Sequence, residues 1–176
     1  AQLAAVLRND HEITLIDANG LNLSLNDIRK MIIDKEFDIC IFRYTPVTFT
    51  EDMLVANLIK KISKSIITMG ICWTLRSFAS DILKRVVDLD ICVIDEPLIV
   101  VPLLIDVLAG DKLLKDVYGV VIKYQNGIIE TADKAPNLID LFQYENMPMP
   151  AYDLLPSLNK YYIRARRESP YTIIQS

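Results

Sequence analysis

The sequence is poor in the residues that most often carry recognisable chemistry. A single histidine, His11, and a single tryptophan, Trp73, are present, so a histidine-rich metal centre is excluded. The three cysteines, Cys40, Cys72 and Cys92, lie far apart in apolar segments, which excludes a zinc or iron–sulfur motif and makes a disulfide framework improbable. We therefore expect Cys40 and Cys92 to be small buried thiols and the setting to be a reducing cytoplasm.

Long apolar runs and an excess of positive charge are also missing. The nearest approach to a membrane span, residues 91–108, is interrupted by Asp95, Glu96 and Asp106, and a span needs roughly 18 uninterrupted apolar residues. No secretory signal is visible. The formal net charge of −4 disfavours nucleic acid as the main partner, because phosphate binding requires a basic surface.

Isoleucine, leucine and valine dominate a composition that is 52% hydrophobic, as is typical of buried parallel strands. Strand-like and helix-like patterns alternate along the first 109 residues, which predicts an α/β, doubly wound, flavodoxin-like or Rossmann-like sheet that is mostly parallel. The expected strands are 12–16, 37–42, 65–71 and 89–94, and the expected helices are 1–7, 24–34, 49–63, 77–87 and 100–109.

The pattern changes after Gly110. Residues 117–123 and 128–131 flank an Asn-Gly pair at 126–127, which predicts a β-hairpin. Residues 132–167 carry several prolines and little periodicity, and an extended linker is expected there. We therefore divide the chain into an α/β domain with its hairpin, 1–131, and a linker ending in a strand, 132–176.

Ligands of open parallel sheets bind where the strands end at their carboxyl side. The loops at those positions are 17–19, 43–48, 70–74 and 95–97. They contain small residues and hydroxyl groups, and Gly70 would allow the backbone to approach a neighbour closely. The alternative for the Gly70 loop is an ordinary tight strand-to-helix turn.

Several segments, in order, resemble the cobalamin-binding half of cobalamin-dependent radical S-adenosylmethionine (SAM) proteins. Residues 70–74, Gly-Ile-Cys-Trp-Thr, stand where many members have Gly-Gly-x-His-x-Thr, and residues 90–97 stand where many have Asp-x-Val-x-x-Gly-Glu-Gly-Glu. The resemblance extends over residues 3–8, 11–18 and 38–42 and over the closing segments 147–156 and 169–176. Cys72, Trp73-Thr74 and Pro97-Leu98 depart from the common pattern.

The resemblance implies that this chain binds cobalamin as the accessory domain of a radical SAM oxidoreductase. The complete protein would also use a four-iron cluster and SAM, acting on a small-molecule substrate by radical methylation or by oxidative cyclisation like that of magnesium-protoporphyrin monomethyl ester. Its cluster-binding cysteines would follow residue 176 in a barrel domain, so the fragment alone should not be catalytic. The expected cofactor-binding residues are Asp17, Asn19, Arg43, Tyr44, Thr45, Thr48, Gly70, Ile71, Cys72, Trp73, Thr74, Glu96 and Pro97.

Histidine-ligating cobalamin proteins use an Asp-x-His-x-x-Gly motif after a strand. Here Asn9, His11 and Thr14 occupy the corresponding places, so that motif is absent. We expect base-off cobalamin without a histidine ligand, and His11 on the surface. Arg43 follows an apolar strand and is a candidate neighbour of the lower corrin face, since a guanidinium cannot ligate cobalt. The alternative is a salt bridge from Arg43 to Asp17 or Glu96.

Two rival interpretations remain open. A response-regulator-like domain would need an acidic cluster around a strand-end aspartate, of which only Asp17 is evident. A degenerate structural module would have lost cobalamin. A further expectation concerns the sheet itself: the first strand of the family pattern is not seen, and the tail 171–175 could pair with a second copy of the chain in a homodimer.

Overall fold

The computed structural model describes residues 1–124, 127–132 and 147–157. The chain divides into two compact units, one formed by residues 1–34 and 148–176 and the other by residues 35–147. Each unit is described by itself. The predicted linker 132–167 and the tail 169–176 lie largely or wholly outside the described residues.

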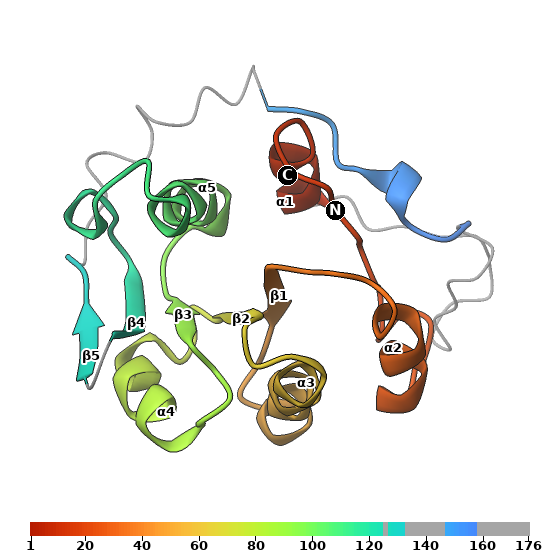
Figure 1. Cartoon of the computed structure of the whole chain (residues 1–176), viewed down its shortest axis with the longest axis horizontal. Coiled ribbons are helices and arrows are strands. Elements are labelled where there is room, and N and C mark those ends of the chain that lie inside the picture. Colours follow the sequence, from red (N-terminus) through yellow and green to blue (C-terminus); the bar gives the residue numbers. More distant parts are fainter. Residues whose placement is uncertain (125–126, 133–146, 158–176) are drawn as a thin grey trace. The chain divides into compact units, whose positions relative to one another are not determined.

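The larger unit contains a five-stranded sheet in the order β1-β2-β3-β4-β5 (Figure 1). Strands β1 (Ile39–Arg43), β2 (Ile67–Ile71) and β3 (Ile91–Val93) are parallel, and β4 (Val120–Tyr124) runs antiparallel between β3 and β5 (Gly127–Glu130). Four of the five strands therefore point the same way. This is the mostly parallel α/β sheet that the alternating patterns predict, and the hairpin pairing around residues 126–127 is confirmed.

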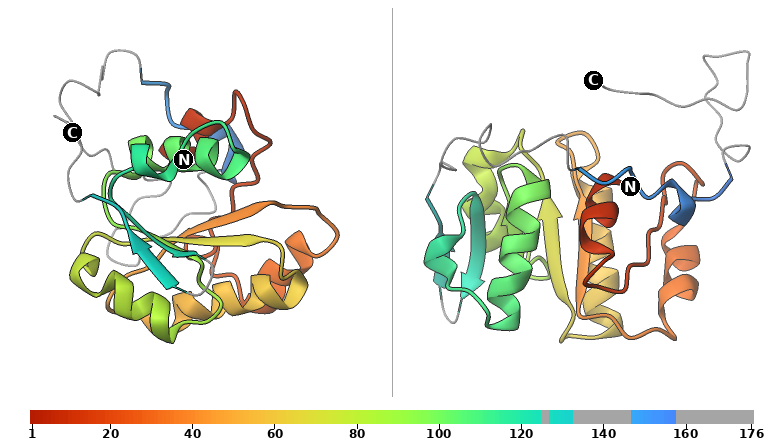
Figure 2. Two further views of the ribbon diagram at one scale, coloured as in Figure 1. Left: turned by 60° about the vertical axis from the view of Figure 1, so that its left-hand side comes forward. Right: turned by 90° about the horizontal axis from the view of Figure 1, so that it is seen from above.

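Helices cover both faces of this sheet (Figures 1 and 2). Helices α3 (Phe49–Ile62) and α4 (Ala79–Arg85), the latter preceded by the 3-10 turn Arg76–Phe78, lie on one face. Helix α5 (Pro97–Ala109) lies on the other. Because side chains alternate between the faces of a strand, the parity of a residue number decides which helices it meets.

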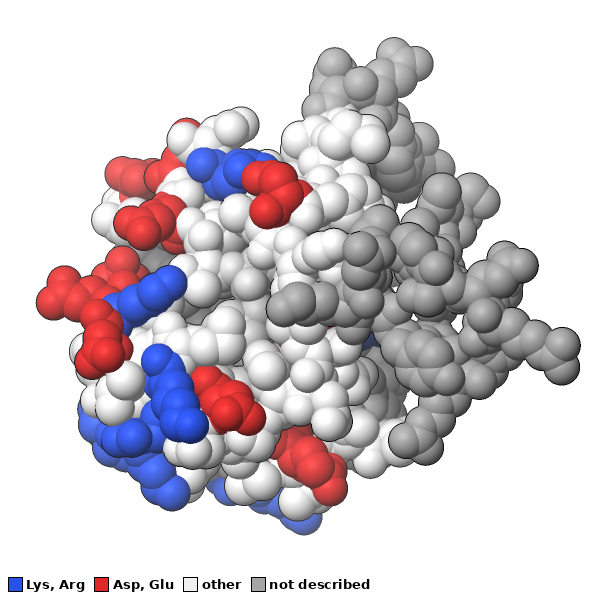
Figure 3. All heavy atoms as spheres, turned by 90° about the vertical axis from the view of Figure 1, so that its right-hand side faces the viewer, with Lys and Arg blue, Asp and Glu red and all other residues white. Residues whose placement is uncertain are grey.

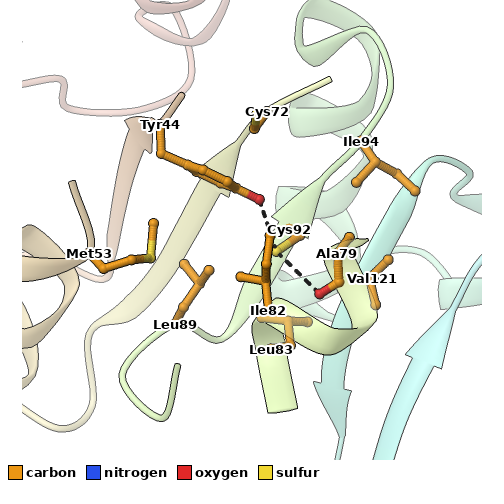
Figure 4. Close-up of a cluster of buried hydrophobic side chains, with 10 residues drawn as sticks. All are labelled: Tyr44, Met53, Cys72, Ala79, Ile82, Leu83, Leu89, Cys92, Ile94 and Val121. Atoms are coloured by element: carbon orange, nitrogen blue, oxygen red, sulfur yellow. Dashed lines mark hydrogen bonds between the residues drawn. The ribbon is translucent and has the colours of Figure 1, made fainter. Parts of the chain in front are cut away.

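The face under α3 and α4 holds a core cluster whose largest polar member is Tyr44 (Figure 4). Tyr44 is 1% exposed, and its hydroxyl donates a hydrogen bond to the Cys92 sulfur at 3.4 Å. Cys92 is fully buried, and burial raises the pKa of its thiol to about 11. Cys92 is thus a packed core residue, as expected, whereas Cys40, expected to be buried as well, is half-buried. Cys72, selected as a cofactor-binding residue, is also buried in this core.

Helix α5 begins earlier than its apolar periodicity indicated. Pro97 occupies the first helical turn, where a missing N–H costs nothing, and Glu96 caps the helix by accepting a hydrogen bond from the Leu98 N–H at 3.2 Å. The helix ends at Gly110 in the left-handed conformation, as predicted. This early start places the beginning of α5 directly after the end of β3.

The smaller unit contains α1 (Gln2–Leu7), α2 (Leu25–Ile32) and a short 3-10 turn (Tyr152–Leu154). A capping box begins α2: the Ser24 and Asp27 side chains each accept a hydrogen bond from the other's backbone N–H. Charged side chains of both signs lie close together on the face drawn in Figure 3. Among the residues described, no helix combines the length and the apolar character needed to cross a membrane.

The prediction of a strand over residues 12–16 is wrong. In the part of the chain that the structure describes, the sheet contains only β1 to β5. Ile13 and Leu15 instead pack against Ala4, Ala5 and Ala151 in their own unit. The apolar residues of this segment pack on one side, as those of a strand would. A strand also needs a neighbouring strand that pairs with its backbone N–H and C=O groups, and the apolar pattern of one segment does not reveal such a neighbour.

Candidate functional site

Four residues lie along the edge of the sheet where β1, β2 and β3 end and the antiparallel β4 begins. Arg43 pairs in register with Ile71, Ile71 with Val93, and Val93 with Val120. Counting two residues onward along β2 and β3, and two backward along the antiparallel β4, leads to Trp73, Asp95 and Tyr118. These three residues lie in loops beyond the strands, and contacts link them to Arg43. The Arg43 guanidinium lies over the Trp73 ring, the Trp73 indole donates to the Asp95 carbonyl, and Gly119, which follows Tyr118, packs closely against Asp95. We call Arg43, Trp73, Asp95 and Tyr118 the carboxyl-edge row.

Trp73 is held in this row by two contacts. Its indole N–H donates to the backbone carbonyl of Asp95 at 2.9 Å, and the Arg43 guanidinium carbon lies 5.5 Å from the ring centroid. The ring nevertheless stays 45% exposed. A fixed but accessible indole is an apolar platform suited to a flat ligand.

Asp95 connects the loop after β3 to its neighbours. Its Oδ1 accepts a hydrogen bond from the Glu96 N–H at 2.8 Å, and its Oδ2 lies 3.8 Å from an Arg76 nitrogen. Gly119 makes this arrangement possible: its φ is +64°, and a Cβ there would lie 2.2 Å from the Asp95 Cβ. Only glycine fits this close approach without displacing the loop.

Tyr118 completes the row and is its most unusual member. The residue is 7% exposed, yet its hydroxyl has no hydrogen-bond partner, and it is the sole such buried side-chain atom among the described residues. Burial raises the pKa of the phenol, and the nearby negative charges of Asp95 and Glu96 raise it further. A buried hydroxyl without a partner is rare and calls for an explanation.

The loop after β1 is organised by Asp52 rather than left open. The Asp52 Oδ2 accepts from the Thr48 hydroxyl at 2.6 Å and from the Thr45 N–H at 3.2 Å. The Thr45 and Thr48 hydroxyl oxygens are 2.8 Å apart. Both threonines, expected to contact a cofactor, are thus tied to the start of α3.

Other predicted residues have structural contacts of their own. The close approach that Gly70 permits is that of Tyr44, because a Cβ on Gly70 would lie 2.7 Å from the Tyr44 ring. The Tyr44 side chain is enclosed in the core, so only its backbone can face a ligand. Ile71 and Cys72 are buried, and the Cys72 sulfur lies 3.2 Å from the exposed Thr74 hydroxyl.

Asp17 and Asn19 belong to the smaller unit, where they form a turn. The Asp17 carboxylate accepts from the Gly20 N–H at 2.9 Å, and the Asn19 carbonyl accepts from the Asn22 N–H at 3.0 Å. His11 is exposed, as predicted. Within the described part of the larger unit, Arg43 contacts Trp73 and forms no ion pair with Glu96.

Sequence reasoning missed Asp95, Arg76, Tyr118 and the organising role of Asp52. The loop 95–97 was selected correctly as a strand end, so Asp95 could have been singled out by its position. Tyr118 could not, because it lies just before a hairpin strand and is brought to the site by the antiparallel pairing of β4 with β3.

No protein-family model matches the chain. An uncharacterized methyltransferase of Pyrococcus horikoshii, PH0819, is 29% identical over 165 residues, which cover 92% of this chain and 34% of that protein. The cobalamin-dependent SAM radical enzyme OxsB, solved with aqua-cobalamin and SAM bound, has a similar fold, with a TM-score of 0.65 and 19% identity over 77% of this chain. OxsB without cobalamin gives a TM-score of 0.60.

These similarities establish the fold. The chain spans 34% of the length of the methyltransferase relative and 19% of the OxsB chain. It therefore shares an α/β fold with a part of a cobalamin-dependent radical SAM enzyme. At 19% sequence identity this similarity shows the fold alone, so the function has to be argued from the residues of the site.

Proposed function

We propose that this chain binds cobalamin across the carboxyl-edge row, base-off and without a histidine ligand, as the accessory domain of a radical SAM protein. The observation that carries the proposal is the half-exposed, doubly anchored Trp73 at the carboxyl edge of a sheet that has the fold of OxsB. Parallel sheets bind ligands at this edge, and a flat corrin needs an apolar platform there.

The residues present fit the group. Trp73 supplies an aromatic surface, and Arg43 supplies a cation that cannot ligate cobalt. Tyr118 supplies a buried hydroxyl that makes no hydrogen bond within the described protein. The backbone of the loops 43–48 and 70–74 would line the rest of the site. Cobalamin, when bound, would supply a cobalt centre able to carry a methyl group, while the protein residues bind, orient and shield it.

We further propose that the complete protein carries a radical SAM barrel with a four-iron cluster and SAM, and transfers a methyl group to a small-molecule substrate. The name of PH0819 supports methyl transfer over cyclisation of a porphyrin ester. The barrel domain would be the principal partner of this chain, and a homodimer of the isolated chain is the remaining alternative partner.

The coordination state is tested by the visible spectrum of bound cobalamin. Protein reconstituted with hydroxocobalamin and reduced to cob(II)alamin should give a base-off spectrum. His11→Ala is the matched variant, because His11 is the single histidine of the sequence. An identical base-off spectrum in both proteins is expected. A base-on spectrum would contradict base-off binding, and a spectrum that His11→Ala alters would contradict the absence of a histidine ligand.

A further inference from the structure

The unpartnered Tyr118 phenol is near enough to Asp95 and Glu96 for their negative charges to raise its pKa. Tyr118 is buried two residues before β4, and Asp95 and Glu96 lie in the loop that follows the neighbouring strand β3. The Ile94 N–H donates to the Gly119 carbonyl at 2.9 Å, which fixes the two segments side by side. The close approach of Gly119 to Asp95 brings them within van der Waals contact.

The donors and acceptors of this group are complementary in kind. A neutral phenol donates one hydrogen bond, whereas an ionised carboxylate only accepts and offers lone pairs on two oxygens. Asp95 uses Oδ1 to accept from the Glu96 N–H, and Glu96 uses Oε1 to accept from the Leu98 N–H. Both carboxylates therefore stay oriented and retain capacity for a further donor.

We propose that Tyr118, Asp95 and Glu96 form a subsite for a primary carboxamide at the periphery of the bound corrin. A carboxamide carries one carbonyl acceptor, which suits the Tyr118 hydroxyl, and two N–H donors, which suit the carboxylates. This assignment rests on the proposed cobalamin binding, since corrin side chains end in such amides. It also explains why a buried hydroxyl lacks a partner in the protein itself.

The proposal predicts opposite responses of stability and affinity. Tyr118→Phe removes a hydroxyl that has no partner in the free protein, so the unfolding midpoint should be unchanged or raised. The same change removes one hydrogen bond to the ligand, so the Kd for hydroxocobalamin should rise about 5- to 10-fold. A residue with a merely structural role would lower the unfolding midpoint instead.

The experiment compares wild type, Tyr118→Phe and Tyr124→Phe by equilibrium dialysis and urea unfolding. Tyr124 is 53% exposed at the far end of β4, so its variant controls for loss of a phenol hydroxyl without loss of the subsite. Dicyanocobinamide, which keeps the corrin amides but lacks the nucleotide tail, is the second probe. The Tyr118→Phe defect should persist with it.

The possible outcomes separate a failure of the carboxamide subsite from a failure of cobalamin binding. If wild type binds hydroxocobalamin and Tyr118→Phe binds it equally well, the subsite is wrong while cobalamin binding stands. A defect that disappears with dicyanocobinamide would also overturn the carboxamide assignment, because it would point to the tail. If wild type binds neither probe, the proposed function itself fails and the subsite falls with it.

Discussion

The two ends of the sheet differ in whether their polar side chains have hydrogen-bond partners. At the amino edge, Lys60 donates to the Ile66 carbonyl at 2.6 Å and forms an ion pair with Asp90. Asp90 also accepts from the Thr68 N–H and hydroxyl, and Lys123 donates to three backbone carbonyls around the end of α4. At the carboxyl edge, Tyr118 has no partner and Trp73 is half exposed.

The difference indicates which end is built for stability and which for a ligand. A closed network of satisfied donors and acceptors rigidifies the fold and leaves little for an incoming molecule. An edge with an exposed aromatic ring and a hydroxyl without a hydrogen-bond partner still has groups that can contact a ligand. The doubly wound topology places such a site at the carboxyl ends of the strands, and the contacts of this chain agree with that rule.

The largest effect is expected at the tightest point of the carboxyl edge. Gly119→Ala places a Cβ 2.2 Å from the Asp95 Cβ, at a φ of +64°. Left-handed backbone costs about 1–2 kcal/mol and overpacking about 1–3 kcal/mol, so the free energy of unfolding should fall by up to about 5 kcal/mol. Urea unfolding measures this change.

Gly110→Ala is the matched control for that prediction. Gly110 has a φ of +90°, but nothing lies within 4 Å of a Cβ there, so only the backbone cost of about 1–2 kcal/mol should appear. Equal losses in the two variants would show that β3 and β4 do not approach as closely as the carboxyl-edge row requires.

A smaller loss is expected from opening the amino edge. Lys60→Met keeps the aliphatic stem but removes the cation, which leaves the Asp90 carboxylate, 28% exposed, without its ion pair. Breaking a buried pair costs about 3–5 kcal/mol, and the partial exposure of Asp90 favours the lower end. The free energy of unfolding should therefore fall by about 3 kcal/mol in urea.

The control for the amino edge is Lys64→Ala. The Lys64 side chain is 83% exposed and lies 4.0 Å from Asp88, so its loss should change stability by less than about 1 kcal/mol. If Lys60→Met changed the free energy of unfolding as little as Lys64→Ala, the polar contacts at the amino edge would not be a stabilising network. The contrast between the two edges would then fail.

Much of the fold was predictable because its signals are local. The predicted strands 65–71 and 89–94, the predicted helix 24–34 and the Asn-Gly hairpin each follow from short-range chemistry. The strand predicted at 12–16 failed because strand formation depends on a neighbour outside the segment.

The site was predictable only where it coincides with strand ends. Arg43 and Trp73 were selected as loop residues, and the structure brings them together. Tyr44 and Gly70 were selected by the same rule, but their side-chain contacts lie in the core, since residue parity and not loop position decides which face a side chain joins. Tyr118 depends on long-range antiparallel pairing and left no local signal.

The central claim, that the carboxyl edge binds cobalamin, is tested most directly by equilibrium dialysis against hydroxocobalamin with two matched variants. Trp73→Ala removes the platform at the carboxyl edge, and Lys64→Ala alters an exposed residue at the amino edge. The account predicts one cobalamin per wild-type and Lys64→Ala chain and an affinity at least about 10-fold weaker for Trp73→Ala. Wild-type protein that retains no cobalamin, or Trp73→Ala protein that retains it as tightly as wild type, would contradict the account.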